Sequence, residues 1–131
     1  MKGPFYSVLS SKCPKCNVGE LYPDPNPYHL KQLGKMHERC SCCGQTYTPE
    51  TGFYYGAMYV SYALGVILTF IPAYSLYLFL NVDVKILIAA VIGIYVFTYP
   101  MVFRLSRNIW LNIFVRFDEE VHQRMIKANR Q

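Results

Sequence analysis

The fold is decided by residues 51–103, which read TGFYYGAMYVSYALGVILTFIPAYSLYLFLNVDVKILIAAVIGIYVFTYPMVF. From Thr51 to Val82, and again from Ile86 to Phe103, the chain contains no Asp, Glu, Lys, Arg or His. A charged side chain at the centre of a bilayer costs at least about 2.5 kcal/mol, so long uncharged apolar runs are typical of membrane spans. We therefore expect transmembrane helices at about 57–80 and 86–103, roughly 36 and 27 Å long.

Only the five residues from Asn81 to Lys85 separate the two spans, so we expect a tight hairpin with both chain termini on one side of the membrane. Six Lys and Arg residues lie in 1–52, six in 104–131 and one in the turn. The positive-inside rule then places both termini in the cytoplasm. No apolar segment typical of a signal peptide precedes the hairpin. Two buried helices of a soluble protein would be the alternative, but little chain is left to cover them.

The rest of the composition agrees with a small module on a membrane anchor. The chain has 131 residues and a formal net charge of +5, and only 16% of its residues are charged against 53% hydrophobic. Soluble domains average about 25% charged residues, and disordered chains are less apolar than this one. We divide the chain into a cytoplasmic module at 1–52, the hairpin at 53–103, and an amphipathic interfacial helix and tail at 104–131.

The module contains all five cysteines, four of them in two C-x2-C pairs: Cys13 with Cys16, and Cys40 with Cys43. Four thiolates at this spacing are typical of a tetrahedral Zn²⁺ site, which leaves no open position for catalysis. A module this small usually needs a metal to fold. We therefore expect a zinc ribbon with short β hairpins and a structural Zn²⁺ bound by these four cysteines. We also expect Gly19 and Gly44 to provide positive φ angles in the two turns.

Other interpretations of the cysteines stay open. The same four ligands could hold iron, as in rubredoxin, or one pair could act as a redox thiol. Cys42 is a possible extra thiol, either for metal transfer or simply an exposed side chain kept reduced by the cytosol. His29 and His37 could replace a thiolate, but we expect both at the surface.

Basic residues surround the cysteines and suggest two kinds of surface partner. They are Lys12, Lys15, Lys31, Lys35 and Arg39. A basic surface can bind nucleic acid or anionic lipid headgroups. Because a tethered module already lies near the headgroups, we expect the lipid bilayer as the partner rather than nucleic acid.

Small residues recur every fourth position in both spans: Ala57, Ser61 and Gly65 in the first, Ala89 and Gly93 in the second. This spacing lets helices approach closely, so we expect a packing seam within the hairpin or against a partner. In an apolar helix rich in small residues the pattern could also be coincidence.

Interfacial residues are expected at the cytoplasmic boundary of the hairpin: Tyr54, Tyr55, Arg104, Arg107 and Trp110. Beyond the second span, apolar residues recur at i, i+4 spacing along one stripe: Leu105, Ile109, Ile113, Phe117 and Val121. We expect this segment to form a helix on the membrane surface or against a partner.

Residues typical of catalysis are not arranged in any motif that we recognise. There is no nucleophile–base pair, phosphate loop, HExxH or paired-carboxylate pattern, and the spans hold no ionisable side chain other than tyrosine. We expect neither an enzyme nor a transporter, and no small-molecule substrate.

Three sequence features together resemble a bacterial membrane family known as domain of unknown function 983. They are Cys13-Pro-Lys-Cys16 with Gly19 and Leu21, the Cys40-x-x-Cys43-Gly44 pair, and Gly52-Phe-Tyr-Tyr-Gly-Ala-Met-Tyr59 leading into the hairpin. The resemblance covers nearly the whole chain, and Ser41 and Cys42 depart from its pattern. It implies a bacterial cytoplasmic membrane. Some members lie near genes for haem-copper oxidase assembly, which implies a respiratory accessory role.

We therefore expect a non-enzymatic membrane protein that serves as a small subunit or assembly factor of a larger membrane complex. One alternative is a membrane-tethered zinc-ribbon module that binds nucleic acid or the ribosome. Another is a metal-handling protein.

Overall fold

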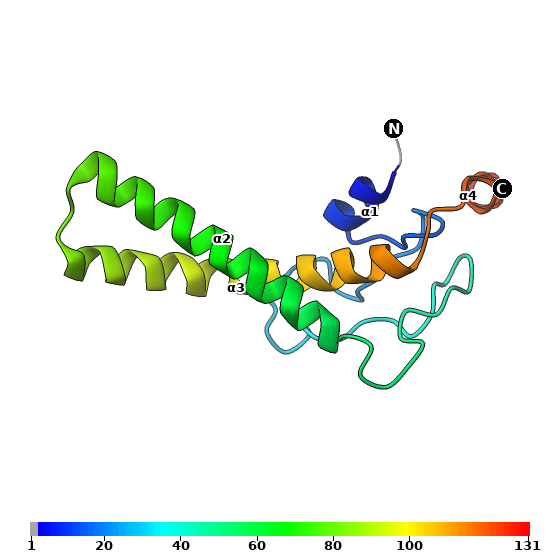
Figure 1. Cartoon of the computed structure of the whole chain (residues 1–131). Helices are drawn as coiled ribbons and strands as arrows, with labels where there is room; N and C mark the ends of the chain where they lie inside the picture. The colour runs from blue at the N-terminus through cyan, green and yellow to red at the C-terminus, as the bar shows by residue number, and fades with distance from the viewer. Residues whose placement is uncertain (1–2) are drawn as a thin grey trace.

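The computed structural model describes residues 3–131 and contains four helices (Figure 1). They are α1 (Pro4–Ser10), α2 (Tyr55–Leu80), α3 (Val84–Phe114) and α4 (Glu119–Asn129). The expected β hairpins are not confirmed, because residues 3–131 form only two isolated antiparallel bridges and no strand. The cysteine loops, α1 and α4 gather at one end of the molecule, opposite the turn that joins α2 to α3.

Helices α2 and α3 form the expected hairpin, and both are long and apolar enough to cross a membrane. The chain reverses through Asn81, which takes the left-handed conformation at φ 45°. Within the most apolar window of each helix, only 6% and 11% of residues are buried. The hairpin surface therefore lies open along most of its length, as membrane spans require.

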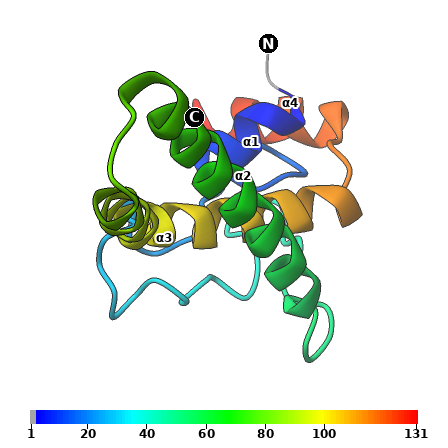
Figure 2. The ribbon, with the colours of Figure 1, turned by 60° about the vertical axis from the view of Figure 1, so that its left-hand side comes forward.

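The two long helices cross obliquely rather than lying parallel (Figure 2). At the crossing Ala57 is buried, the hydroxyl groups of Ser61 and Ser106 are hydrogen-bonded, and Gly65 is buried against the ring of Tyr95. The three small residues expected on the first span thus lie where the helices meet.

The small residues of the second span lie elsewhere. Ala89 and Gly93 are exposed, and no atom would come within 4 Å of a Cβ added at Gly93. They lie in the first third of α3, toward the turn that joins it to α2. Of the small residues predicted for the seam, only those of α2 lie at the contact between the two helices. A role for Ala89 and Gly93 against a partner remains a prediction.

Helix α3 continues well past Phe103, where we expected the second span to end. Its 31 residues are about 46 Å long, whereas a hydrocarbon core is about 30 Å thick. The extra length carries residues 104–114 out of the uncharged segment and along the cysteine loops. The last residues of the candidate span and the first residues of the expected tail thus belong to one continuous helix.

The single apolar stripe expected over 105–121 is wrong, because the helix breaks at 115–118. Val115 and Asp118 adopt extended conformations, and the backbone N–H of Asp118 donates to the carbonyl of Lys15 in the first cysteine turn. Asp118 then caps α4 by accepting from the N–H of Val121. The chain leaves the helix here because it makes backbone contact with the cysteine module.

The apolar core lies around the cysteines and draws on both ends of the chain. Its fully buried members are Cys13, Cys16, Leu21, Tyr22, Cys40, Tyr47 and Leu111. Leu111 comes from α3, and Val115, Val121 and Met125 pack on the same core from the C-terminal segment. The cysteine module and the tail therefore share one core.

Helix α1 was not expected from the sequence. It packs against α3 through polar contacts: the Asn108 amide donates to the carbonyl of Val8 and to Ser11 Oγ, and the Asn112 amide donates to Ser7 Oγ. Phe5 and Leu9 of α1 are exposed.

Gly56 and Gly93 allow a test of this helix crossing. A Cβ at Gly56 would overlap the indole of Trp110, whose Nε1–H donates to the carbonyl of Phe53. We expect Gly56→Ala to destabilise the protein by about 1–3 kcal/mol through overpacking. Gly93→Ala should be neutral or stabilise it by up to about 1 kcal/mol, since alanine is the better helix former. Thermal unfolding in detergent, followed by emission of the single tryptophan, measures the stability of both variants. Equal changes in stability would contradict the described packing of α2 against α3.

Candidate metal centre

Each cysteine pair lies in a tight turn closed by one antiparallel bridge. Lys12 pairs with Glu20 around the first turn, and Arg39 with Thr46 around the second. Inside the turns, the N–H of Cys13 donates to the carbonyl of Gly19, and the N–H of Cys40 donates to that of Gln45. The two turns are therefore built alike, each closed by a single isolated bridge rather than by paired strands.

The residues that permit these turns differ in part from those expected. Gly44 has a positive φ of 73°, as expected. In the first turn Asn17, not Gly19, takes the left-handed conformation, with φ 53°. Gly19 is needed for space instead, because a Cβ there would overlap Cys40 Sγ. Asparagine tolerates the left-handed region better than most residues.

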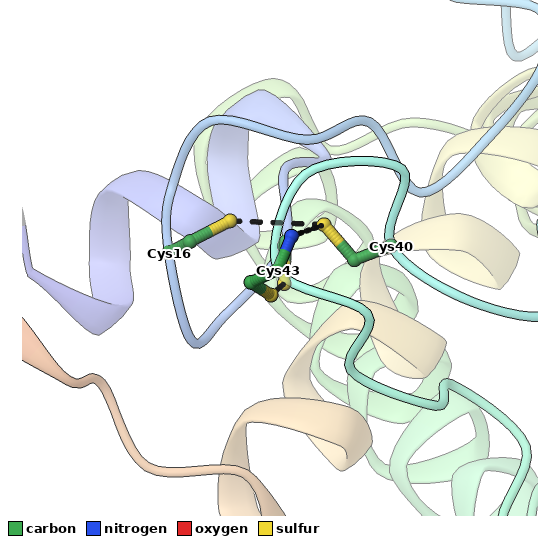
Figure 3. Close-up of side chains that lie close together, drawn as sticks. Cys16, Cys40 and Cys43 are labelled. Atoms are coloured by element: carbon green, nitrogen blue, oxygen red, sulfur yellow. Dashed lines mark hydrogen bonds between the residues drawn. The ribbon is translucent and has the colours of Figure 1, made fainter. Parts of the chain in front are cut away.

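The sulfur atoms of the four cysteines lie close together, and Figure 3 shows the side chains of Cys16, Cys40 and Cys43 directed toward one another. Cys13 Sγ lies 3.7 Å from Cys43 Sγ, and Cys16 Sγ lies 3.7 Å from Cys40 Sγ. All four sulfurs are within 4.8 Å of one another. Ligands about 2.3 Å from a tetrahedral Zn²⁺ would be about 3.8 Å apart. The four cysteines are therefore positioned to bind one metal ion, with a geometry consistent with zinc.

Burial disfavours the thiolate form of two of the ligands when no cation is present. It raises the pKa of Cys13 to about 11 and raises the pKa of Cys43 further. Burial also raises the pKa of Cys40, but hydrogen bonds from the Tyr47 hydroxyl and backbone N–H groups lower it to about 6. A bound divalent cation would stabilise all four thiolates together, so metal binding and folding of this segment are linked.

Tyr47 is a functional residue that the sequence analysis missed. Its ring is fully buried in the core, and its hydroxyl lies beside the Cys40 sulfur. Its backbone carbonyl accepts a hydrogen bond from the Tyr54 hydroxyl at 2.8 Å. Tyr47 thus links the ligand Cys40 to the residue that precedes α2.

His122 was also missed. It is buried at the start of α4, where its ring Nδ1–H donates to the carbonyl of Cys16 and its ring packs against Phe117. Together with the Asp118 contact to Lys15, this hydrogen bond holds the C-terminal segment against the first cysteine turn. A histidine 106 residues away in sequence carries no local signal of this role.

The remaining candidate ligands lie outside the cluster. Cys42 is exposed, with its sulfur 3.9 Å from Ser41 Oγ. His37 is exposed, and His29 is exposed and paired with Asp24.

The expected interfacial residues join the module to the hairpin. The Arg107 guanidinium stacks over Phe103 and Tyr54 and donates to the carbonyl of Gly34. Arg104 is buried rather than at an open interface, and it donates to the carbonyl of Asp24. Of the expected set, Tyr55 alone is exposed.

A family model described as "Protein of unknown function (DUF983)" matches residues 30–114. The match includes the second cysteine turn, α2 and α3, and it begins after Cys13 and Cys16. No curated protein and no solved structure matches the chain. The assignment of Cys13 and Cys16 as metal ligands therefore rests on the geometry of this chain and not on the family match.

Substitution of single cysteines tests the metal centre. We expect the purified wild-type chain to contain one metal ion, measured by elemental analysis, which also identifies the metal. Cys16→Ser should lose most of the metal and lower the unfolding temperature, because a buried ligand is removed. Cys42→Ser should keep the metal content unchanged. Equal loss in both variants would contradict the assigned ligand set.

A second substitution tests the C-terminal contact. His122→Ala removes a buried hydrogen bond and leaves the carbonyl of Cys16 without its partner. We expect it to destabilise the protein by about 1–3 kcal/mol and to speed metal loss to a chelator. His37→Ala, at an exposed histidine of the same module, is the control and should behave like wild type. Unchanged chelation kinetics in both variants would show that α4 does not support the site.

Proposed function

This chain belongs to the DUF983 family of proteins of unknown function, and from that premise we propose that it is a non-enzymatic accessory or assembly protein of a larger membrane complex. In this proposal α2 and α3 span the bacterial cytoplasmic membrane, and the cysteine module lies in the cytoplasm. The chain contributes binding surfaces rather than chemistry.

The observation that carries the proposal is the exposure of tyrosine side chains, with their polar hydroxyl groups, on the surface of the hairpin. Tyr62 and Tyr74 are 75% and 66% exposed on α2. Each lies about 9 Å along the axis from the middle of the helix, well inside the roughly 15 Å half-thickness of a hydrocarbon core. A phenol hydroxyl at that depth is costly unless it finds a hydrogen-bond partner. A neighbouring transmembrane helix would supply one.

Side-chain hydrogen bonds join the hairpin to the cysteine module, which suits a docking platform. From α3, Arg104 and Arg107 donate hydrogen bonds to backbone carbonyls of the module, at Asp24 and Gly34, and Trp110 donates to the carbonyl of Phe53 just before α2. A partner that contacts both the spans and the module would therefore meet surfaces in a fixed relation.

Zinc in the four-cysteine site would supply positive charge that stabilises the buried thiolates, and it would hold the two turns together. A site with four protein ligands has no open coordination position, which favours a structural role. Cys13, Cys16, Cys40 and Cys43 would hold the ion.

Metal handling is the second candidate, because the exposed Cys42 thiol lies one residue from a ligand. If Cys42 transfers metal, Cys42→Ser should slow exchange of bound metal with a chelator without lowering metal content. Unchanged exchange would remove this candidate.

Purification of the full chain in mild detergent tests the accessory role. We expect a discrete complex larger than the 15.2 kDa chain, with a stoichiometric membrane partner found by mass spectrometry. The double substitution Tyr62→Phe and Tyr74→Phe should weaken recovery of that partner, whereas Tyr28→Phe in the cysteine module should not. A chain that is monomeric both in detergent and after cross-linking in its native membrane would overturn the proposal.

A further inference from the structure

A pocket of about 250 Å³ lies where α2 and α3 cross, and we call it the crossing pocket. Its walls are mainly aromatic, with Tyr54 and Tyr62 on the side of α2 and Tyr95, Tyr99 and Phe103 on α3. One charged residue, the cation Arg107, lines it, and no acidic residue of the described chain does. The crossing pocket therefore combines an apolar lining with a single positive charge.

The aromatic residues of α3 form a ladder of rings that leads to Arg107. Tyr95, Tyr99, Phe103 and Arg107 are spaced four residues apart, which places them on one face of the helix. The ring centres of Tyr95 and Tyr99 are 6.3 Å apart, and those of Tyr99 and Phe103 are 6.2 Å apart. The guanidinium carbon of Arg107 lies 4.5 Å from the centre of the Phe103 ring. A continuous ring surface thus runs from the uncharged part of α3 to a guanidinium group.

Arg107 has donors that a ligand can reach. Within residues 3–131 its guanidinium makes one hydrogen bond, from Nη1 to the carbonyl of Gly34 at 3.1 Å, and neither of the two ion pairs there includes it. The side chain is only partly buried, and none of its nitrogens is enclosed without a partner, whereas Nε and Nη2 of Arg104 are. A guanidinium has five N–H donors and stays protonated at physiological pH. Arg107 is therefore the arginine at this end of the span that is able to bind an anion.

The position of Arg107 along α3 matches the headgroup layer of a bilayer. Phe103 ends the uncharged run, and Arg107 lies about 6 Å beyond it along the helix axis. Headgroups occupy roughly 5–7 Å on each side of the hydrocarbon core. If the uncharged run of α3 spans that core, as in the proposed function, Arg107 lies at the depth of the lipid phosphates. Tyr95 and Tyr99 then lie at the depth of the acyl chains.

We propose that the crossing pocket binds one anionic phospholipid, with the phosphate on Arg107 and an acyl chain along the rings of Tyr99 and Phe103. Charge complementarity favours an anionic headgroup, because the pocket has one cation and no acid in its lining. The hydroxyl groups of Ser61 and Ser106 in its wall are hydrogen-bonded to each other, so they need no polar partner from the ligand. This inference rests on the membrane placement of the proposed function.

Native mass spectrometry of the delipidated full chain in detergent tests the site, with phosphatidylglycerol and diacylglycerol of the same acyl chains as probes. We expect one phosphatidylglycerol per chain, bound at least about tenfold more tightly than diacylglycerol, the effect of one charge-assisted hydrogen bond. Arg107→Gln keeps an amide N–H for the carbonyl of Gly34 but removes the charge, so it should reduce that preference several-fold. Arg116→Gln, at an exposed arginine, is the matched control and should leave the preference unchanged.

Tyr99→Ala keeps the test informative if Arg107→Gln folds poorly. The Tyr99 side chain is about half exposed, and its removal shortens the ladder of rings. Because both probes carry the same acyl chains, we expect Tyr99→Ala to weaken binding of both several-fold. Tyr59→Ala, at an exposed tyrosine of α2 that does not line the crossing pocket, should weaken neither. A residue with a purely structural role would lower the unfolding temperature of the lipid-free chain without changing these affinities.

The outcomes separate this proposal from the accessory role. Equal binding of the two probes by the wild type, or an unchanged preference in Arg107→Gln, would overturn the lipid site. Inorganic phosphate should compete poorly, because it makes no contact with the rings, and full competition at equal concentration would overturn the lipid as the occupant. A chain that keeps the preference but recovers no partner overturns only the accessory role. A chain that recovers a partner but shows no preference overturns only the lipid site.

Discussion

The convergence of four cysteine sulfurs from two turns is the contact on which the rest of the module depends. Few fully buried apolar side chains surround it, and most of the apolar residues lie on the open surface of the hairpin. Such a small core cannot offset the conformational entropy of about 50 loop residues by burial alone. A metal ion shared by Cys13, Cys16, Cys40 and Cys43 would close the loop between the turns, which is why the segment needs no sheet.

The length of α3 couples this module to the hairpin. A helix that ended at the boundary of the hydrocarbon core would leave the cysteine turns on a flexible tether. Instead α3 extends to Phe114, where Leu111 enters the cysteine core and His122 follows on α4. The N-terminal and C-terminal segments therefore meet at the candidate metal centre. We expect a substitution in one segment to change the stability of the other.

The sequence allowed prediction of the hairpin and of the ligand set, because both follow from local rules. A run without charges indicates a span whatever surrounds it, and two C-x2-C pairs place their thiols through turn geometry alone. The sequence did not allow prediction of His122, Tyr47, α1 or the burial of Arg104, since each depends on contacts between segments far apart in the chain. The expected stripe over 105–121 failed for the same reason: a backbone hydrogen bond to Lys15 ends the helical register at 115–118.

Near its C-terminal end, α3 buries several polar side chains and exposes several apolar ones. Arg104, Ser106 and Asn108 are buried, whereas Met101, Ile113 and Phe114 are exposed. A helix in water would have the opposite arrangement. Polar side chains can be buried here because α1 and the cysteine loops offer backbone carbonyls to Asn108 and Arg104. The exposed apolar side chains are then free to face lipid or a partner helix. These hydrogen bonds from Arg104 and Asn108 hold the cysteine loops and α1 against the C-terminal part of α3.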